Sequence, residues 1–124
     1  MNKGVSVALG GAIGSVLRYY VAGWFQNRLG ASFPYGTLIV NVSGAFLIGL
    51  LMTAFLEHFD ASPQWRLFLV IGVLGGYTTF SSLTWEAYQL IRSGSVIASI
   101  LYAGGSFAAG FTGLLAGVWI ARWI

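Results

Sequence analysis

The chain has 124 residues, of which 57% are hydrophobic and only 7% are charged, and its formal net charge is +3. A soluble domain carries about a quarter charged residues, so this composition excludes an ordinary soluble domain and indicates a membrane protein. The lack of cysteine in the sequence excludes disulfides and thiolate metal sites. The six Lys and Arg residues are scattered rather than clustered, so no nucleic-acid partner is expected.

Four long windows that are almost free of charge predict transmembrane helices near residues 5–25, 34–56, 66–91 and 95–122. Each window approaches or exceeds the roughly 20 apolar residues that cross a hydrocarbon core of about 30 Å. The connections between the windows are too short to form a domain outside the membrane. We therefore predict an all-α membrane protein in which residues 1–124 form a single four-helix transmembrane domain.

The first span combines closely spaced glycines with one charge. Gly10 and Gly14 are one turn apart, which favours close packing of two helices, although glycine is also frequent in membrane helices generally. Arg18 lies near the end of the same span, within snorkelling reach of the interface. A charge inside a membrane segment is a functional candidate by default. We interpret Arg18 as a vestibule charge that draws anions to a pore mouth, and Glu86, near the end of the third span, as a second vestibule charge.

Polar side chains lie one turn apart on the second and fourth spans. Thr37 and Asn41 share one face of the second span, and Tyr102 and Ser106 share one face of the fourth. The Asn amide and the hydroxyls are hydrogen-bond donors, and donors without a carboxylate suit an anion better than a cation or a proton. The alternative is that these groups join helices, where a hydrogen bond contributes about 1 kcal/mol.

The third span contains the stretch GGYTTFSSL from Gly75 to Leu83, which predicts a break in the helix at Gly75–Thr79. Non-helical backbone at membrane depth must be buried in protein or line a wet cavity, because unpaired peptide groups are costly in lipid. Its carbonyl oxygens are candidates to hold a cation, and the lack of nearby acidic residues favours a monovalent ion. The alternative is a kink in which the hydroxyls of Thr78 and Thr79 satisfy the backbone.

Phe80 follows the break directly. An aromatic ring is electropositive at its edge, so the ring can face a small anion without trapping it in strong hydrogen bonds. Conduction requires such weak binding, because an ion must leave each site as readily as it enters. Packing between helices is the alternative role for this side chain.

The distribution of Lys and Arg predicts insertion in both orientations. An even number of spans puts Lys3, Arg66 and Arg122 on one side of the membrane, and Arg28 and Arg92 on the other. Orientation follows the Lys and Arg bias of short loops, and a three-to-two split is almost no bias. Two oppositely inserted copies would form an antiparallel, dual-topology homodimer, equivalent to the inverted repeats of transporters.

The elements GSVLR (14–18), GTLIVNVSG (36–44) and GVLGGYTTFS (72–81) resemble the Fluc (CrcB) family of bacterial fluoride channels. The resemblance covers essentially the whole chain, and the third element is its most specific part. It implies a passive fluoride-selective channel in the bacterial inner membrane, a multi-pass protein that exports cytoplasmic fluoride. It also implies an antiparallel dual-topology homodimer with two pores.

The resemblance further implies roles for individual residues. Carbonyl oxygens of Gly75 and Thr78 match those that hold a structural Na⁺ at the dimer interface of the family. Asn41 matches the pore-lining asparagine of the family and Phe80 its first "Phe box" ring. The remaining polar residues of the expected anion pathway are Thr37, Tyr102, Ser106 and Ser81.

One position departs from the family pattern, because Leu83 stands where a second phenylalanine is expected. Leucine has no electropositive edge, so one ring site of the anion pathway is missing and conduction is expected to be reduced. Two alternatives to a channel are a small multidrug-resistance exporter and a structural membrane subunit. The exporter needs a carboxylate in the first span, where this chain has none, and the subunit would not need Asn41 or the helix break. No nucleophile–base pair is evident, so no enzyme activity is expected.

Overall fold

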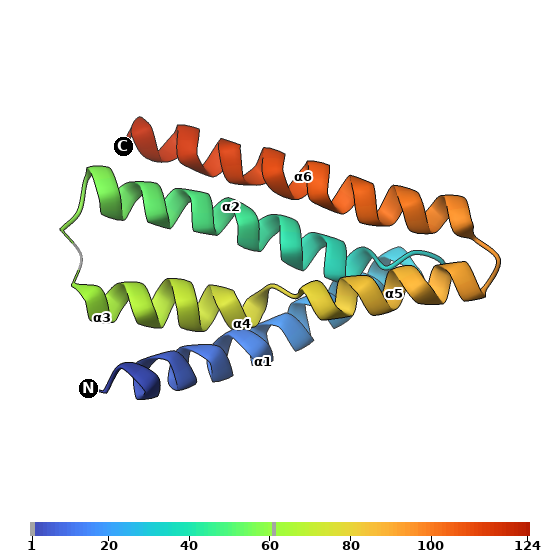
Figure 1. Cartoon of the computed structure of the whole chain (residues 1–124), viewed down its shortest axis with the longest axis horizontal. Helices are drawn as coiled ribbons and strands as arrows, with labels where there is room; N and C mark the ends of the chain where they lie inside the picture. Colours follow the sequence, from blue (N-terminus) through green and yellow to red (C-terminus); the bar gives the residue numbers. More distant parts are fainter. Residues whose placement is uncertain (1, 61) are drawn as a thin grey trace.

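The computed structural model describes residues 2–60 and 62–124 of the chain. Its described residues form helices and connecting turns (Figure 1). The elements in chain order are α1 (Lys3–Leu29), α2 (Tyr35–Glu57), α3 (Pro63–Arg66), the π-helix η1 (Leu67–Leu74), α4 (Gly75–Tyr77), α5 (Phe80–Arg92) and α6 (Val96–Arg122).

The prediction of an all-helical protein with four membrane-spanning helices is confirmed. Four helical stretches are long and apolar enough to cross a membrane, and the third of them runs from α3 to α5. The first stretch is longer than predicted at both ends. Asn2 caps the start of α1, because its side-chain oxygen accepts a hydrogen bond of 2.7 Å from the N–H of Gly4.

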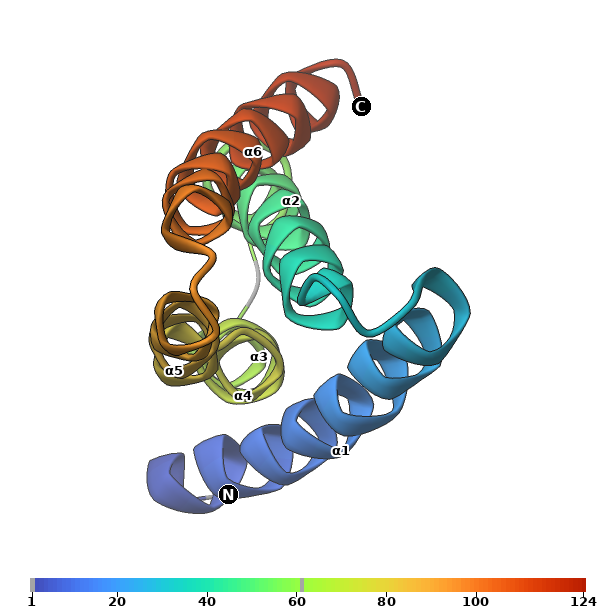
Figure 2. The ribbon, with the colours of Figure 1, turned by 90° about the vertical axis from the view of Figure 1, so that its right-hand side faces the viewer.

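The helices lie roughly alongside one another, with α2 and the third span placed between α1 and α6 (Figures 1 and 2). The most extensive packing in the bundle is between α2 and α6, and α1 packs against η1 and α4. Both termini and the connection between α2 and α3 lie at the same end of the bundle (Figure 1). The other two connections lie at the opposite end, as an even number of spans requires.

Glycine sets the distance between α1 and the third span. A Cβ atom added at Gly10 would lie 2.9 Å from the Cα of Gly72, and one at Gly14 would collide with the carbonyl oxygen of Val73. The two backbones therefore touch at these positions, as small residues permit in membrane helices. By contrast, a Cβ at Gly105 of α6 would meet no heavy atom within 4 Å.

The third span departs from α-helical geometry in two places. Leu67–Leu74 forms a π-helix, which the sequence did not predict. Gly75 and Gly76, where the break was expected to begin, are helical. The extended residues are Thr78 (φ −85°, ψ 156°) and Thr79 (φ −151°, ψ 122°), and α5 starts again at Phe80. The backbone of Thr79 therefore needs hydrogen-bond partners from outside the third span.

Much of the apolar surface remains uncovered within one chain. Only 11% of the most apolar window of α6 is buried, although that helix is long enough to span a membrane. Phe107 and Phe111 stack on its exposed face, with ring centroids 6.2 Å apart. This surface therefore faces either lipid or another protein chain.

Candidate ion pathway at the helix break

Asn41 of α2 supplies both hydrogen bonds that the extended backbone of Thr79 needs. Its Nδ2 donates to the carbonyl oxygen of Thr79 at 2.9 Å, and its Oδ1 accepts from the N–H of Thr79 at 2.8 Å. This pairing identifies which amide atom is oxygen, because Thr79 presents one donor and one acceptor. One of the two Nδ2 hydrogens is used, so the second remains as a donor at the break.

The carbonyl groups of Gly75, Gly76 and Thr78 lose their normal helical partners at the break. In a continuous α-helix, each carbonyl accepts from the N–H four residues ahead. The N–H of Thr79, the regular partner of Gly75, bonds to Asn41 instead. The N–H of Ser82, the regular partner of Thr78, bonds to Thr79 Oγ1 at 3.1 Å. The third carbonyl belongs to Gly76, and it accepts a hydrogen bond of 3.1 Å from the Nε of Arg18.

The sequence allowed a kink in which the hydroxyls of Thr78 and Thr79 satisfy the backbone, and this alternative holds in part. The hydroxyl of Thr78 helps to end α4. The N–H and the Oγ1 of Thr78 both donate to the carbonyl oxygen of Leu74, each at 3.0 Å. The hydroxyl of Thr79 instead caps α5 through the bond to Ser82. The break is therefore held by side chains from both sides of it and by α1 and α2.

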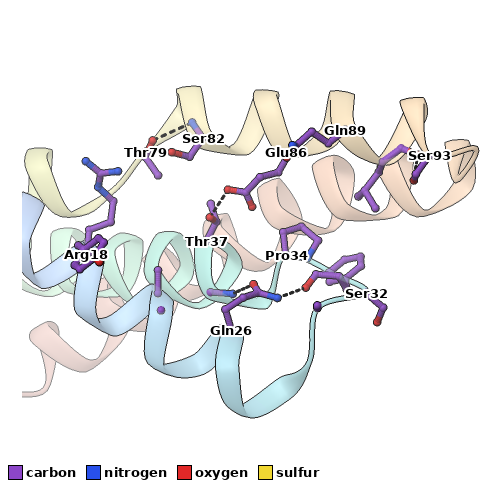
Figure 3. Close-up of a pocket in the computed structure, with 17 residues that line it drawn as sticks. Arg18, Gln26, Ser32, Pro34, Thr37, Thr79, Ser82, Glu86, Gln89 and Ser93 are labelled. Atoms are coloured by element: carbon purple, nitrogen blue, oxygen red, sulfur yellow. Dashed lines mark hydrogen bonds between the residues drawn. The ribbon is translucent and has the colours of Figure 1, made fainter.

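The expectation that the polar pathway has no carboxylate beside it is wrong, because the carboxylate of Glu86 lies there. Thr37 Oγ1 donates to Glu86 Oε1 at 2.6 Å, and the hydroxyl of Tyr102 donates to Glu86 Oε2 at 3.3 Å (Figure 3 shows the first bond). Thr37 and Tyr102 are both buried. Their hydroxyls therefore point to a carboxylate that comes from the third span, 49 and 16 residues away in the sequence.

A cavity of about 830 Å³ opens between α1, α2 and α5. Glu86 and Thr37 lie on one wall, and the side chain of Arg18 points from α1 toward the break (Figure 3). Gln26 shapes the mouth, because its amide bonds the carbonyl of Phe33 at 2.8 Å and the N–H of Gly36 at 3.0 Å. These bonds hold the connection between α1 and α2 against the cavity.

A second cavity of about 500 Å³ lies on the other side of the break. Its wall includes Asn41, Phe80, Leu83 and Ser106, and Thr79 lines both cavities. Ser106 is 6% exposed, and its hydroxyl has no hydrogen-bond partner among the described residues. A buried hydroxyl without a partner costs about 1–3 kcal/mol, so Ser106 is a candidate donor to a group that enters this cavity.

The structure thus places the predicted site residues in three groups: those that line the first cavity, those that line the second and those that line neither. Arg18 and Thr37 line the first cavity, whereas Asn41, Phe80, Leu83 and Ser106 line the second. The two remaining pathway residues, Ser81 and Tyr102, line neither cavity. Ser81 is exposed on α5 with its hydroxyl 3.4 Å from Thr79 Oγ1, and Tyr102 is linked to the first cavity through its hydrogen bond to Glu86.

The sequence placed Thr79 in the break but not as a residue that lines both cavities, and it did not single out Gln26. The extended backbone of Thr79 and its place between the cavities depend on Asn41. No local sequence pattern predicts the contact between these two residues. Gln26 follows the first span and carries an amide that can bridge a backbone donor and acceptor, which was the available signal. Across the described ranges 2–60 and 62–124, no three His, Asp or Glu side chains gather as a metal site.

Four apolar spans and two cavities that share one lining residue at a helix break define a small membrane protein with cavities between its helices. A family model described as "CrcB-like protein, Camphor Resistance (CrcB)" matches residues 5–118. The chain belongs to the CrcB family. It is a multi-pass bacterial membrane protein.

Several curated relatives named "Fluoride-specific ion channel FluC" are similar over nearly the whole chain. The relative from Roseiflexus sp. is 48% identical over 118 residues, which are 95% of each chain. The relative from Solibacter usitatus is 46% identical over 120 residues, 97% of this chain and 98% of its own. The relative from Thermus thermophilus is 54% identical over 109 residues, 88% of this chain and 83% of its own.

Proposed function

We propose that the protein is a passive fluoride channel that exports fluoride from the cytoplasm, as the names of its relatives suggest. The observation that carries this proposal is the buried hydroxyl of Ser106, which lines the second cavity without a partner. A small anion that accepts a hydrogen bond there would relieve the cost of the unpaired donor. Fluoride is small enough and a strong enough acceptor to use such a site.

The route of the anion follows from the two cavities. Arg18 provides the positive charge of the first cavity, and Thr79 leads from that cavity to the second. In the second cavity, the ion meets the free amide hydrogen of Asn41, the hydroxyl of Ser106 and the ring of Phe80. We assign Thr37 and Tyr102 to holding Glu86 rather than to binding fluoride, because their hydroxyls already donate to its carboxylate.

Leu83 reduces conduction in this proposal. It lines the second cavity together with Phe80, so a side chain at this position is close enough to affect an ion there. A leucine presents only methyl groups, and an ion that loses water at this point gains no electrostatic compensation.

The functional unit in this proposal is an antiparallel dual-topology homodimer. Phe80 is 76% exposed although it lines the second cavity, so one chain leaves that cavity open. A second, inverted copy is the partner that the nearly balanced distribution of Lys and Arg favours. Covering the exposed apolar rings would turn the open cavity into a closed path.

A structural Na⁺ at the dimer interface also belongs to the proposal, and the residues of the break fit it. The carbonyls of Gly75 and Thr78 have lost their regular helical donors to Asn41 and Thr79, so their oxygens are available as ligands. Carbonyl oxygens without a cluster of carboxylates suit a monovalent cation. The ion would supply positive charge that holds two helix breaks together.

Flux from liposomes tests the channel. The purified chain should release fluoride from loaded vesicles without a proton gradient, and chloride release should be far slower. Ser106→Ala should lower fluoride flux about tenfold, which corresponds to the loss of one hydrogen bond of about 1.4 kcal/mol. Equal rates for fluoride and chloride, or transport only with a proton gradient, would contradict the proposal and favour an exporter.

A further inference from the structure

Arg18 makes a contact that a vestibule charge alone does not require. Its Nε donates to the carbonyl oxygen of Gly76 at 3.1 Å, across 58 residues of sequence. In a continuous helix, that carbonyl would accept from the N–H of Phe80, and the extended residues Thr78 and Thr79 remove this partner. The Arg18 side chain therefore replaces a helical hydrogen bond at the end of α4.

The backbone of α1 lies directly against this peptide. A Cβ added at Gly76 would lie 2.7 Å from the carbonyl oxygen of Gly11, and one at Gly14 would lie 2.9 Å from the N–H nitrogen of Tyr77. These two close approaches fix α4 on α1 immediately before the break. Arg18 lies one turn beyond Gly14 on the same helix, so its contact extends this attachment to the last carbonyls of α4.

We propose that Arg18 is a positioning residue for the break: its hydrogen bond fixes the Gly76 peptide and thereby orients the adjacent carbonyl of Gly75 and, through Tyr77, the carbonyl of Thr78 toward a cation. This inference rests on the Na⁺ site of the proposed function. Gly75, Gly76 and Tyr77 share the helical backbone of α4, so fixing the Gly76 peptide limits the φ and ψ rotations that would turn the carbonyl of Gly75 or, through Tyr77, that of Thr78. The remaining nitrogens of the guanidinium stay available to the first cavity, which Arg18 lines.

The charge of Arg18 and its hydrogen bond to the Gly76 carbonyl have opposite effects on the binding of a cation. The two roles of Arg18 can therefore be separated by experiment. A positive charge near the break repels Na⁺, so removing the charge alone would strengthen cation binding. Losing the hydrogen bond frees the Gly76 carbonyl and weakens an oriented site. Lysine keeps the charge but lacks the planar fork of arginine, and its single ammonium cannot replace Nε in the same geometry.

The experiment measures the stability of the full-length dimer in detergent as Na⁺ replaces choline at constant ionic strength. Arg18→Lys should raise the Na⁺ concentration at half effect about tenfold, equivalent to 1.4 kcal/mol. Arg28→Lys is the matched control, because Arg28 lies over the ring of Trp24 at 4.6 Å and does not bond the break. The control should keep the midpoint of the unaltered chain. Arg18→Gln, which removes both the positive charge and the Nε–H donor, provides a second variant.

Each outcome has a distinct meaning. If the unaltered chain depends on Na⁺ and both Arg18 variants keep its midpoint or bind Na⁺ more tightly, Arg18 acts only as a charge and the inference is wrong. If the unaltered chain conducts fluoride without any dependence on Na⁺, the cation site and this inference both fail while the channel stands. The Nε–H signal of ¹⁵N-labelled Arg18, assigned by its loss in Arg18→Lys, should exchange slowly with water; rapid exchange would also overturn the inference.

Discussion

The two hydrogen bonds between Asn41 and Thr79 give a prediction whose size follows from the structure. Asn41→Ala would remove both bonds, of 2.9 Å and 2.8 Å, and leave the peptide groups of Thr79 without those partners. Hydrogen bonds between membrane helices contribute about 0.6 kcal/mol each on average and about 1.7 kcal/mol at most. We therefore expect the free energy of unfolding to fall by about 1–3 kcal/mol for the two bonds.

Reversible unfolding in mixed micelles with increasing SDS, followed by circular dichroism, measures this change. Ser106→Ala is the matched control in the same cavity, because its hydroxyl has no partner among the described residues. The control should leave stability unchanged or slightly raised, since an unsatisfied buried group is removed. Both variants should lower fluoride flux, and Asn41→Ala alone should also destabilise the protein. A stability within about 0.3 kcal/mol of the unaltered chain would show that Asn41 does not hold the break.

Three further predictions concern conduction, orientation and packing. Leu83→Phe should raise fluoride flux at matched protein density in liposomes and Leu83→Ile should not, because only the ring offers an electropositive edge. An unaltered rate in Leu83→Phe would show that Leu83 only packs and takes no part in conduction. Two or three lysines added near one terminus should fix the orientation and abolish flux, and an oppositely biased copy should restore it. Normal conduction by a singly oriented population would exclude the antiparallel dimer. Gly14→Ala should destabilise the protein by about 1–3 kcal/mol, because the new methyl group meets the carbonyl of Val73, whereas Gly105→Ala has open space and should be neutral in the same unfolding assay.

Hydropathy along the sequence was sufficient to identify the four membrane-spanning helices. A membrane span must satisfy its own backbone and present apolar side chains over its whole length, so the signal lies within one continuous segment. The close approach at Gly10 and Gly14 was predictable for a related reason, because only small residues allow two backbones to touch. Family membership also followed from local elements of the sequence, and the match over residues 5–118 confirms it.

The partners of the polar side chains were decided only by the tertiary structure. Periodicity placed Thr37 and Asn41 on one face of a helix, yet Thr37 bonds Glu86 and Asn41 bonds the backbone of Thr79. These contacts join residues 49 and 38 positions apart, and a donor can bond to any acceptor that packing brings within reach. The interruption of the third span at Thr79 depends on the same packing. Extended backbone persists at membrane depth because α2 delivers an amide that replaces both missing hydrogen bonds.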